Sequence, residues 1–390
     1  MSKTLQDYAT LINDTIQSNE INHYITTDNM CQNLGGIDTF KNINIPQRKV
    51  RSFQKDDVLL SNIRLYFRKV YRAKQKGGCS SDVLVFRAKR IDSATLFAIL
   101  SSQIFTDYAC SGSQGSKMPR GNKTHMMDFK IPTINFTIAK IFNSIQNKIE
   151  NNHKINELLH KILELLYEQY FVRFDFLDEN NKPYQTSGGK MKFSKELNRL
   201  IPNNFEVKTL GELITWISGS QPPKSCHTYE HKEGYIRFIQ NRDYNSNDYI
   251  TYIPISKNNK ICYQYDIMID KYGEAGAVRF GLQGAYNVAL SKISVLNQSM
   301  QEYIRSYLNS KPIKKYLSNA CMASTRSSLN ENHIYSLMLP IPPINLLQKY
   351  EKIAKNIITA IIKNNQSTQT LTALRDFLLP LLLKQQVKPQ

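Results

Sequence analysis

The sequence predicts an α+β protein with two similar mixed α/β units and two long helices packed as an antiparallel coiled coil. Two observations lead to this prediction. Similar short motifs recur in the same order after about 210 residues, and each copy ends in a long run of apolar residues at helical spacing. We therefore expect a pseudo-twofold internal repeat, in which each half contributes one unit and one helix.

The two units are expected over residues 1–131 and 205–341. Short apolar runs rich in β-branched residues, bounded by turn-forming residues, predict their strands. The strand candidates are residues 58–61 and 81–88 in the first unit and 235–240, 248–254, 265–271 and 289–296 in the second. Each half is thus predicted to be a mixed α/β unit followed by a helix.

The repeat is clearest late in each half. Ala109-Cys110 recurs as Ala320-Cys321, and the run from Ile131 to Asn135 recurs from Ile341 to Asn345. Two earlier matches are Leu5–Ala9 with Leu210–Ile214 and Asp57–Leu60 with Asp266–Ile269. The shared order indicates that one folding pattern is used twice.

A long amphipathic helix is predicted in each of the segments 132–178 and 342–390. The apolar spacing extends to about Phe171 in the first and over 344–379 in the second, and Pro380 is expected to end or kink that helix. At 1.5 Å per residue the first helix would be about 55 Å long. Because each helix must bury its apolar stripe, we expect the two to pair and to act as a spacer and docking element.

Polar residues interrupt this pattern at three places. Asn151-Asn152 and Asn364-Asn365 lie in the two helical runs. They are either seam residues that define the register of the helix pair or ordinary solvated breaks. Residues 179–204 are rich in polar residues with Gly, Pro and Asn, so we expect a linker there.

The charge of the chain favours a polyanionic partner. Lysine and arginine number 51 against 32 acidic residues, giving a net charge of +19. Nucleic acid is the first candidate and an anionic membrane surface the second. No apolar run of 18 residues occurs, so no membrane span is expected. Six scattered cysteines are typical of reduced thiols in a cytoplasmic protein.

Sequence motifs for catalysis or cofactor binding are weak. Cys226, His227 and His231 lack a second ligand pair at zinc-finger spacing, so neither a metal nor another cofactor is expected. Phosphate-loop, amino-methyltransferase and zinc-protease motifs are absent from the sequence. Glu206 and Lys208 form a nuclease-like acid–x–Lys pair, but their surroundings fit better the entry to the second unit.

The chain resembles the specificity subunits of Type I restriction–modification systems over nearly its whole length. The resemblance rests on the order of several motifs in both halves and in the linker. The motifs are LLSNIR at 59–64, GGCSSDVLVF at 77–86, KMPRGNK at 117–123, KPYQTSGGKM at 182–191, LGE at 210–212, YIRFIQNRDY at 235–244 and GAYNVAL at 284–290. Gln6 stands where this family has the glycine of LGE, so the first half departs from the family pattern at this position.

The resemblance implies two target recognition domains that each read half of a split duplex sequence. It also implies that the helices bind modification subunits, and two such subunits are expected. Restriction subunits would join the complex through the modification subunits. Adenine methylation and DNA cleavage would belong to those partners, so the chain itself is expected not to be an enzyme. The alternatives are a protein-binding module that mimics such a subunit through its helices, and a self-contained nuclease.

Candidate DNA contacts are basic, amide and aromatic residues in three settings. The first unit has a basic stretch with interleaved aromatics, and a Gly/Ser-rich loop follows it. The second unit has polar residues just after a predicted strand, where Arg and Gln could read base edges. The candidates are Asn62, Arg64, Tyr66, Arg68, Lys69, Lys117, Arg120, Lys123, Gln240, Arg242, Lys271, Tyr272, Arg326 and Ser327. For any single residue, a solvated or structural role is the competing interpretation.

Overall fold

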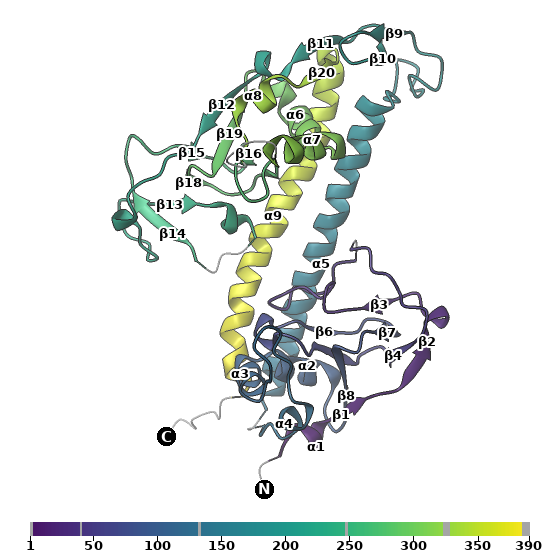
Figure 1. Ribbon diagram of the computed structural model, residues 1–390, viewed down its shortest axis with the longest axis vertical. Helices are drawn as coiled ribbons and strands as arrows, with labels where there is room; N and C mark the ends of the chain where they lie inside the picture. The colour runs from purple at the N-terminus through teal and green to yellow at the C-terminus, as the bar shows by residue number, and fades with distance from the viewer. Residues whose placement is uncertain (1–2, 40, 132–133, 246–248, 323–327, 384–390) are drawn as a thin grey trace. The chain divides into compact units, whose positions relative to one another are not determined.

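The computed structural model describes residues 3–39, 41–131, 134–245, 249–322 and 328–383. The chain forms two compact units. The first combines residues 1–155 with residues 364–390, and the second is continuous over residues 156–363. Each unit therefore contains parts of both long helices (Figure 1).

The main sheet of the first unit has four antiparallel strands in the order β1-β8-β5-β6. These are Ala9–Ile12, Val83–Ala88, Val58–Ser61 and Val70–Arg72. All four residues of β5 are buried, as expected for an apolar central strand. The helices α2 (Ser93–Ser101) and α3 (Gln103–Ser111) contribute to the hydrophobic core of this unit.

A second sheet of the first unit has the order β2-β4-β7-β3. Its strands are Thr15–Gln17, Lys49–Phe53, Gly77–Cys79 and Tyr24–Ile25. β3 runs parallel to β7, whereas β4 runs antiparallel to both of its neighbours. A separate small core lies against this sheet and includes Ile25, Phe53 and Cys79.

The main sheet of the second unit repeats that of the first, with the order β12-β19-β16-β17. The strands are Ile214–Ser218, Leu290–Val295, Ile267–Asp270 and Val278–Arg279. The other sheet has the order β14-β13-β18-β15, formed by Thr251–Pro254, Tyr235–Ile239, Gly284–Tyr286 and Ile261–Cys262. Its parallel pair β13-β18 and antiparallel partner β15 correspond to β3-β7 and β4, but its fourth strand lies on the opposite edge.

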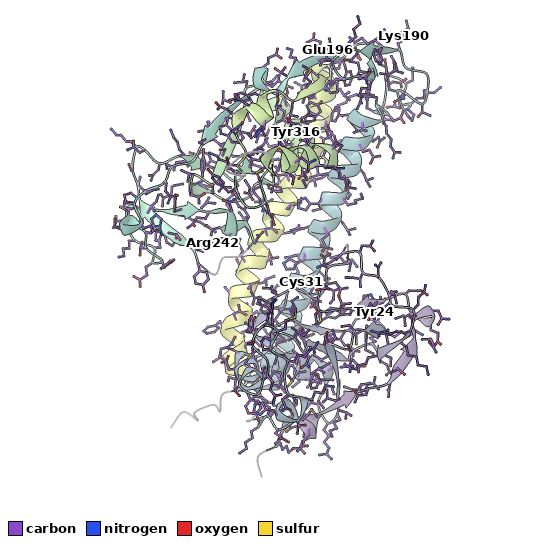
Figure 2. All side chains as sticks on the ribbon, in the orientation of Figure 1. Tyr24, Cys31, Lys190, Glu196, Arg242 and Tyr316 are labelled. Carbon is purple, nitrogen blue, oxygen red and sulfur yellow. The ribbon has the colours of Figure 1, made fainter. Side chains whose placement is uncertain are left out.

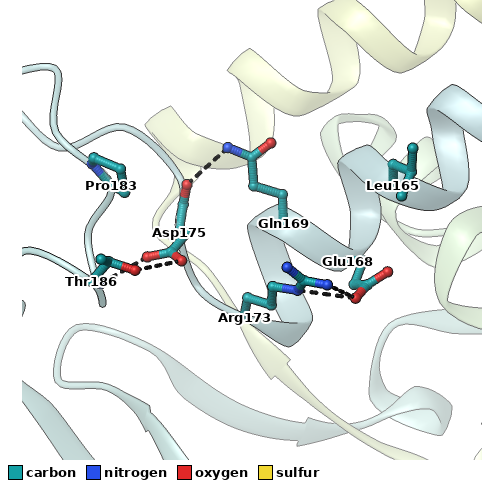
Figure 3. Close-up of a pocket in the computed structure, with 7 residues that line it drawn as sticks. All are labelled: Leu165, Glu168, Gln169, Arg173, Asp175, Pro183 and Thr186. Atoms are coloured by element: carbon teal, nitrogen blue, oxygen red, sulfur yellow. Dashed lines mark hydrogen bonds and ion pairs between the residues drawn. The ribbon is translucent and has the colours of Figure 1, made fainter.

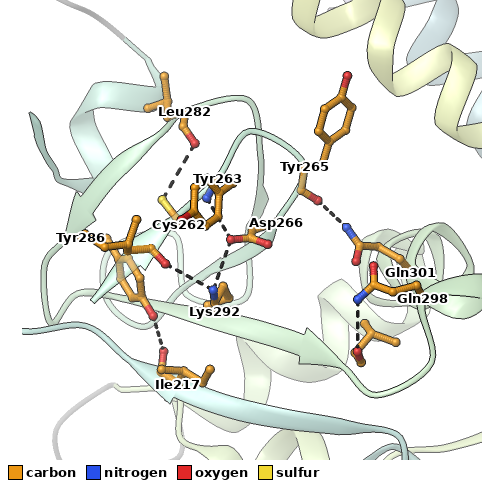
Figure 4. A network of polar contacts seen from close by, with 12 residues as sticks. Ile217, Cys262, Tyr263, Tyr265, Asp266, Leu282, Tyr286, Lys292, Gln298 and Gln301 are labelled. Carbon is orange, nitrogen blue, oxygen red and sulfur yellow. Dashed lines mark hydrogen bonds and ion pairs between the residues drawn. The ribbon is translucent and has the colours of Figure 1, made fainter. Parts of the chain in front are cut away.

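An acidic residue before the central strand is used in the same way in both units. Asp57 accepts a hydrogen bond from the Gln54 N–H at 2.7 Å and pairs with Arg87 at 2.8 Å. Asp266 accepts one from the Tyr263 N–H at 2.9 Å and pairs with Lys292 at 3.3 Å (Figure 4). The match of the Asp57 and Asp266 segments noted in the sequence is therefore a match in structure.

Helices and their caps repeat as well. α2, α3 and α4 (Lys123–Met127) have counterparts in α6 (Gln301–Asn309), α7 (Lys311–Met322) and α8 (Glu331–Tyr335). α1 (Leu5–Tyr8) and the 3-10 turn Leu210–Glu212 each begin with a threonine capping box. α4 and α8 are both capped by an asparagine, Asn122 and Asn330, that accepts the backbone N–H three residues later.

The two long helices are α5 (Phe136–Tyr167), which continues as a π-helical turn over Glu168–Val172, and α9 (Ile344–Leu382). α9 continues two residues past Pro380. In the first unit, the Asn135 N–H donates to the Leu382 carbonyl at 3.1 Å, and Asn152 Nδ2 donates to Thr368 Oγ1 at 3.1 Å. Between these two contacts the residue number increases along α5 and decreases along α9. The two helical segments of the first unit therefore run antiparallel, as predicted.

The asparagines behave differently from one another. Asn152 is buried and bonded to Thr368 across the two helices, which is the seam position that one interpretation expected. Asn151 and Asn365 are exposed, as the other interpretation expected. The pair Asn151-Asn152 thus divides between the two roles.

The segment expected to be a linker contains regular structure. β9 (Met191–Ser194) and β10 (Arg199–Pro202) form an antiparallel hairpin, and Ile201 is buried in the core of the second unit. β11 (Glu206–Thr209) then pairs with β20 (Met338–Ile341). The polar composition of residues 179–204 concealed this hairpin from the sequence pattern. Lys192 and Phe193 of β9 are both exposed, so this strand has no run of buried apolar residues.

Candidate nucleic-acid interface

A tight turn presents the first group of candidate residues in the first unit. The 3-10 turn Leu65–Phe67 is flanked by Arg64 and Arg68, which both have left-handed backbone conformations, with φ of 50° and 49°. Tyr66 projects from this turn and is 54% exposed. Its ring meets the edge of Phe67 at a centroid distance of 4.7 Å, and the Arg64 guanidinium lies 5.9 Å from the Phe67 ring. The turn therefore carries a half-buried cation beside Phe67, next to the exposed ring of Tyr66.

The Gly/Ser-rich loop lies directly against this turn. The Arg64 N–H donates to the Pro119 carbonyl at 2.9 Å, and the Gly121 N–H donates to the Asn62 carbonyl at 3.1 Å. A Cβ atom at Gly121 would lie 2.1 Å from Met126 Cε and 2.8 Å from Leu65 Cδ1, so the ends of these side chains would have to shift for any other residue. The fold thus brings together two segments that are about 50 residues apart in the sequence.

The charged residues of this loop are accessible. Lys117 and Lys123 are exposed, and Lys123 is the first residue of α4. Arg120 is also exposed and pairs with Asp82 at 3.0 Å. The Gln114 and Arg120 backbones bond to each other in both directions, which closes the loop between them. Positive charge is therefore presented on a loop held at its base.

Three predicted residues of the first unit point inward. The Arg68 Nη2 donates to the Ser101 carbonyl at 3.0 Å, and Lys69 Nζ donates to the Thr27 carbonyl at 2.5 Å. Burial lowers the pKa of both side chains. Asn62 is only 8% exposed, and its Oδ1 has no hydrogen-bond partner in the described part of the chain. The Arg68 and Lys69 side chains therefore connect the turn to other parts of the unit, whereas Asn62 is buried.

The second unit presents its candidates after β13. Gln240 caps the 3-10 turn Asn241–Tyr244 through a capping box with Asp243. The Arg242 side chain, labelled in Figure 2, is 51% exposed. Its Nη2 lies 3.4 Å from Thr251 Oγ1, and its guanidinium lies 6.0 Å from the Tyr249 ring. Arg242 is therefore an accessible cation with a defined orientation.

A second loop of this unit joins the first through Asn241, whose Nδ2 donates to the Tyr272 carbonyl at 3.2 Å. Tyr272 is 44% exposed, and Lys271 Nζ lies 6.0 Å from its ring. The Leu329 N–H donates to the Lys271 carbonyl at 3.0 Å. The structure thus brings Gln240, Arg242, Lys271 and Tyr272 onto neighbouring loops. Arg326 and Ser327 lie outside the described residues.

Two exposed tyrosines in the second unit were not predicted. Tyr249 is 65% exposed and lies against Arg242, and Tyr229 is 72% exposed. Aromatic rings at the surface can stack on bases or sugars. Tyr249 falls in the apolar run 248–254 that predicted a strand, so its role as a ring beside Arg242 could not be separated from a core role by composition alone.

The other candidate chemistries have no assembled site in the described residues. Glu206 and Lys208 lie 3.8 Å apart on β11 and pair with each other. No group of three or more His, Cys, Asp or Glu residues that could hold a metal ion occurs in the described ranges. A pocket of about 340 Å³ beside the end of α5 is lined by charged residues that already have partners, since Arg173 pairs with Glu168 and Asp175 accepts from Thr186 (Figure 3).

Among the described helices, none has a stretch both long and apolar enough to cross a membrane.

Comparison with known proteins gives a consistent family signal. Residues 202–373 match the family model of the Type I restriction modification DNA specificity domain. The Type I restriction enzyme MjaIX specificity subunit of Methanocaldococcus jannaschii is 24% identical over 300 residues, which are 74% of this chain and 67% of that protein. The HindI specificity subunit of Haemophilus influenzae is 22% identical over 309 residues, 64% of this chain and 66% of that protein. The chain therefore matches about two thirds of the length of each relative.

The fold has a solved counterpart. The crystal structure of the Type-I restriction-modification system S subunit from M. genitalium matches with a TM-score of 0.63 at 15% sequence identity. The match covers 99% of this chain and 96% of that one. Together with the sequence matches, it confirms the predicted resemblance and fold class.

Proposed function

We propose that this chain, which is similar to Type I restriction enzyme specificity subunits, binds a bipartite duplex DNA sequence and directs partner subunits to it. The observation that carries the proposal is the repetition of one α/β unit in which a cation lies beside an aromatic ring: half-buried Arg64 beside Phe67 and next to the exposed Tyr66 in the first copy, and exposed Arg242 beside exposed Tyr249 in the second. Two related units suit a target of two half-sites, because each unit can occupy one stretch of groove.

The exposed side chains divide into two chemical roles. Lys117, Arg120 and Lys123 lie on a loop and would contact phosphates, which supplies affinity without sequence preference. Arg64 and Arg242 each stand beside an aromatic ring, and a guanidinium can donate two hydrogen bonds to the major-groove edge of guanine. Each such base contact is worth about 1–3 kcal/mol of discrimination.

Methylation and cleavage are assigned to partner subunits. The second-unit part of α5 carries an apolar stripe at helical spacing formed by Leu158, Ile162 and Leu165, which are 48%, 49% and 50% exposed. Such a stripe is a suitable surface for a helix of a modification subunit. Restriction subunits would then join through the modification subunits.

The proposal is tested by producing the chain with its modification subunit in a host without other adenine methylation. Sequencing of the host DNA at single-base resolution should reveal one split motif with a constant gap. Methylation by the isolated chain with S-adenosylmethionine would contradict the non-catalytic role. Absence of salt-sensitive DNA retention would instead favour a module that binds only protein, and DNA cleavage by the chain with magnesium ions would favour a nuclease.

A further inference from the structure

Two polar side chains are fully buried where the long helices meet the first unit. Arg375 of α9 is 2% exposed, and Gln146 of α5 is 1% exposed. Arg375 Nη1 donates to Gln146 Oε1 at 3.2 Å and to the Asn33 carbonyl, also at 3.2 Å. Gln146 Nε2 donates to the Leu34 carbonyl at 2.6 Å. The helices thus supply hydrogen-bond donors to two successive backbone carbonyls.

Those two residues also contact the turn that presents Arg64 and Tyr66. The Asn33 N–H donates to the Phe67 carbonyl at 2.9 Å, and the Leu34 N–H donates to the Arg68 carbonyl at 3.1 Å. Asn33 and Leu34 have φ values of 52° and 61°. Asparagine adopts left-handed backbone readily, but this conformation is unfavourable for leucine, so other contacts must maintain it at Leu34.

These contacts form one continuous hydrogen-bonded path. It leads from the helices through Asn33 and Leu34 to Phe67 and Arg68 of the turn. We infer that Arg375 and Gln146 are positioning residues, which orient the 3-10 turn Leu65–Phe67 so that Arg64 and Tyr66 can read DNA. The inference rests on the proposed function, because it concerns the same interface.

The buried guanidinium suits this role better than a purely packing role. Its charge is balanced by Asp376, whose Oδ1 lies 3.0 Å from Arg375 Nε. A methionine at 375 could fill similar space but would leave the Asn33 carbonyl without this donor. The orientation of the loop therefore depends on two buried donors, Arg375 and Gln146.

The path is specific to the first unit. Counted from the paired asparagines of the two helices, the α5 position equivalent to Arg375 is Ile162, which cannot donate a hydrogen bond and is 49% exposed. A change at Arg375 should therefore affect one half of the target and leave the other half unchanged.

The experiment compares methylation motifs of variants produced with the modification subunit. Arg64→Ala and Arg242→Ala first assign which half of the motif each unit reads. Arg375→Met and, separately, Gln146→Met should then lower discrimination about tenfold at bases in the half assigned to Arg64. Base discrimination in the half assigned to Arg242 should equal that of the wild type.

Leu379→Ala is the matched control, because Leu379 is also on α9, is 3% exposed and packs in the core of the first unit. It should lower thermal stability and total methylation without changing base discrimination in either half of the motif. An unchanged motif in Arg375→Met or Gln146→Met, or equal blurring in Leu379→Ala, would overturn the inference. Failure of the proposed function is distinguishable, since the wild type would then give no split motif. If Arg375→Met does not fold, Gln146→Met decides alone.

Discussion

Basic side chains of one short segment, residues 61–69, contact different parts of the first unit. Arg64 lies beside Phe67 and donates to the Lys117 carbonyl of the Gly/Ser-rich loop, whereas Arg68 and Lys69 donate to the carbonyls of Ser101 and Thr27. Composition alone predicted the cluster but not this division. The direction of each side chain depends on the left-handed backbone at Arg64 and Arg68 and on which distant carbonyls lie nearby. Neither is visible in a local pattern of charge.

Lys117 should act on DNA affinity without affecting sequence preference. In the complex with modification subunits, Lys117→Ala should reduce the slope of log affinity against log salt concentration by about one, because one phosphate contact is lost. Anisotropy titrations with a labelled duplex at several salt concentrations measure this slope. Lys140→Ala, an exposed lysine on α5, is the control and should leave the slope unchanged. Equal slopes for all three proteins would argue against a phosphate contact at Lys117.

Glu351 predicts a pH dependence of stability in the second unit. Burial raises the pKa of Glu351 to about 7, although its carboxylate accepts the Glu302 N–H at 2.9 Å and lies near Arg305. The native state therefore binds this proton more tightly than the unfolded state. Stability should fall as the pH rises from the ordinary value of the carboxyl, 4.5, to about 7, and then level off.

Glu351→Gln removes this titration while keeping an acceptor for the Glu302 N–H. We expect it to flatten the dependence of the melting temperature on pH and to add about 1 kcal/mol of stability at about pH 8, after allowance for solvent screening. Melting curves at several pH values test this. Asp270, whose pKa burial raises to about 6, has the same sign and should leave a residual slope. Parallel pH profiles of wild type and variant would refute the assignment.

At the scale of elements, the long helices and a minority of the strands followed from periodicity. The helical spacing predicted α5 and α9, and the apolar runs predicted β5, β8, β13, β16 and β19. The hairpin β9-β10 was missed because its turn residues and exposed polar side chains have the composition of a linker. The sequence also could not predict that β2 and β14 lie on different edges of their sheets, since strand order depends on contacts between distant segments.

The apolar stripe on α5 carries a prediction for assembly. Leu158→Ser combined with Ile162→Ser should weaken binding of the modification subunit at least about tenfold, because buried aliphatic contacts would be lost. Folding should be little affected, since both side chains are about half exposed in the chain itself. Size-exclusion chromatography and melting curves separate the two effects. Lys154→Gln on the same helix is the control, and undiminished assembly of the double variant would exclude this stripe as the docking surface.

At the scale of the whole molecule, the sequence suggested consecutive segments, 1–131, 132–178, 179–204, 205–341 and 342–390. The compact units of the structure group residues differently, because the end of α9 packs into the core of the first unit through Leu379 and Leu382. Such grouping depends on long-range packing that periodicity does not encode. The repeat itself was predictable, because both copies keep the same motifs in the same order.

This grouping predicts the effect of a truncation. A chain that ends at Lys363 should lose the stability of the first unit, since the deletion of Leu379 and Leu382 alone removes about 2–5 kcal/mol each. Hydrogen–deuterium exchange should show lost protection in β5 and α2, while β16 and β19 stay protected. Equal loss of protection in both units would contradict independent cores.

The discontinuous first unit also has a consequence for biosynthesis. Residues 364–390 leave the ribosome after all of residues 156–363, so the second unit is available for folding before the first can be completed. Many chains fold their amino-terminal domain first during translation. Here the second unit would fold before the first, and the apolar residues of the first core would stay incompletely buried until the end of α9 is synthesised. A nascent chain paused in that interval is therefore the form most in need of a chaperone.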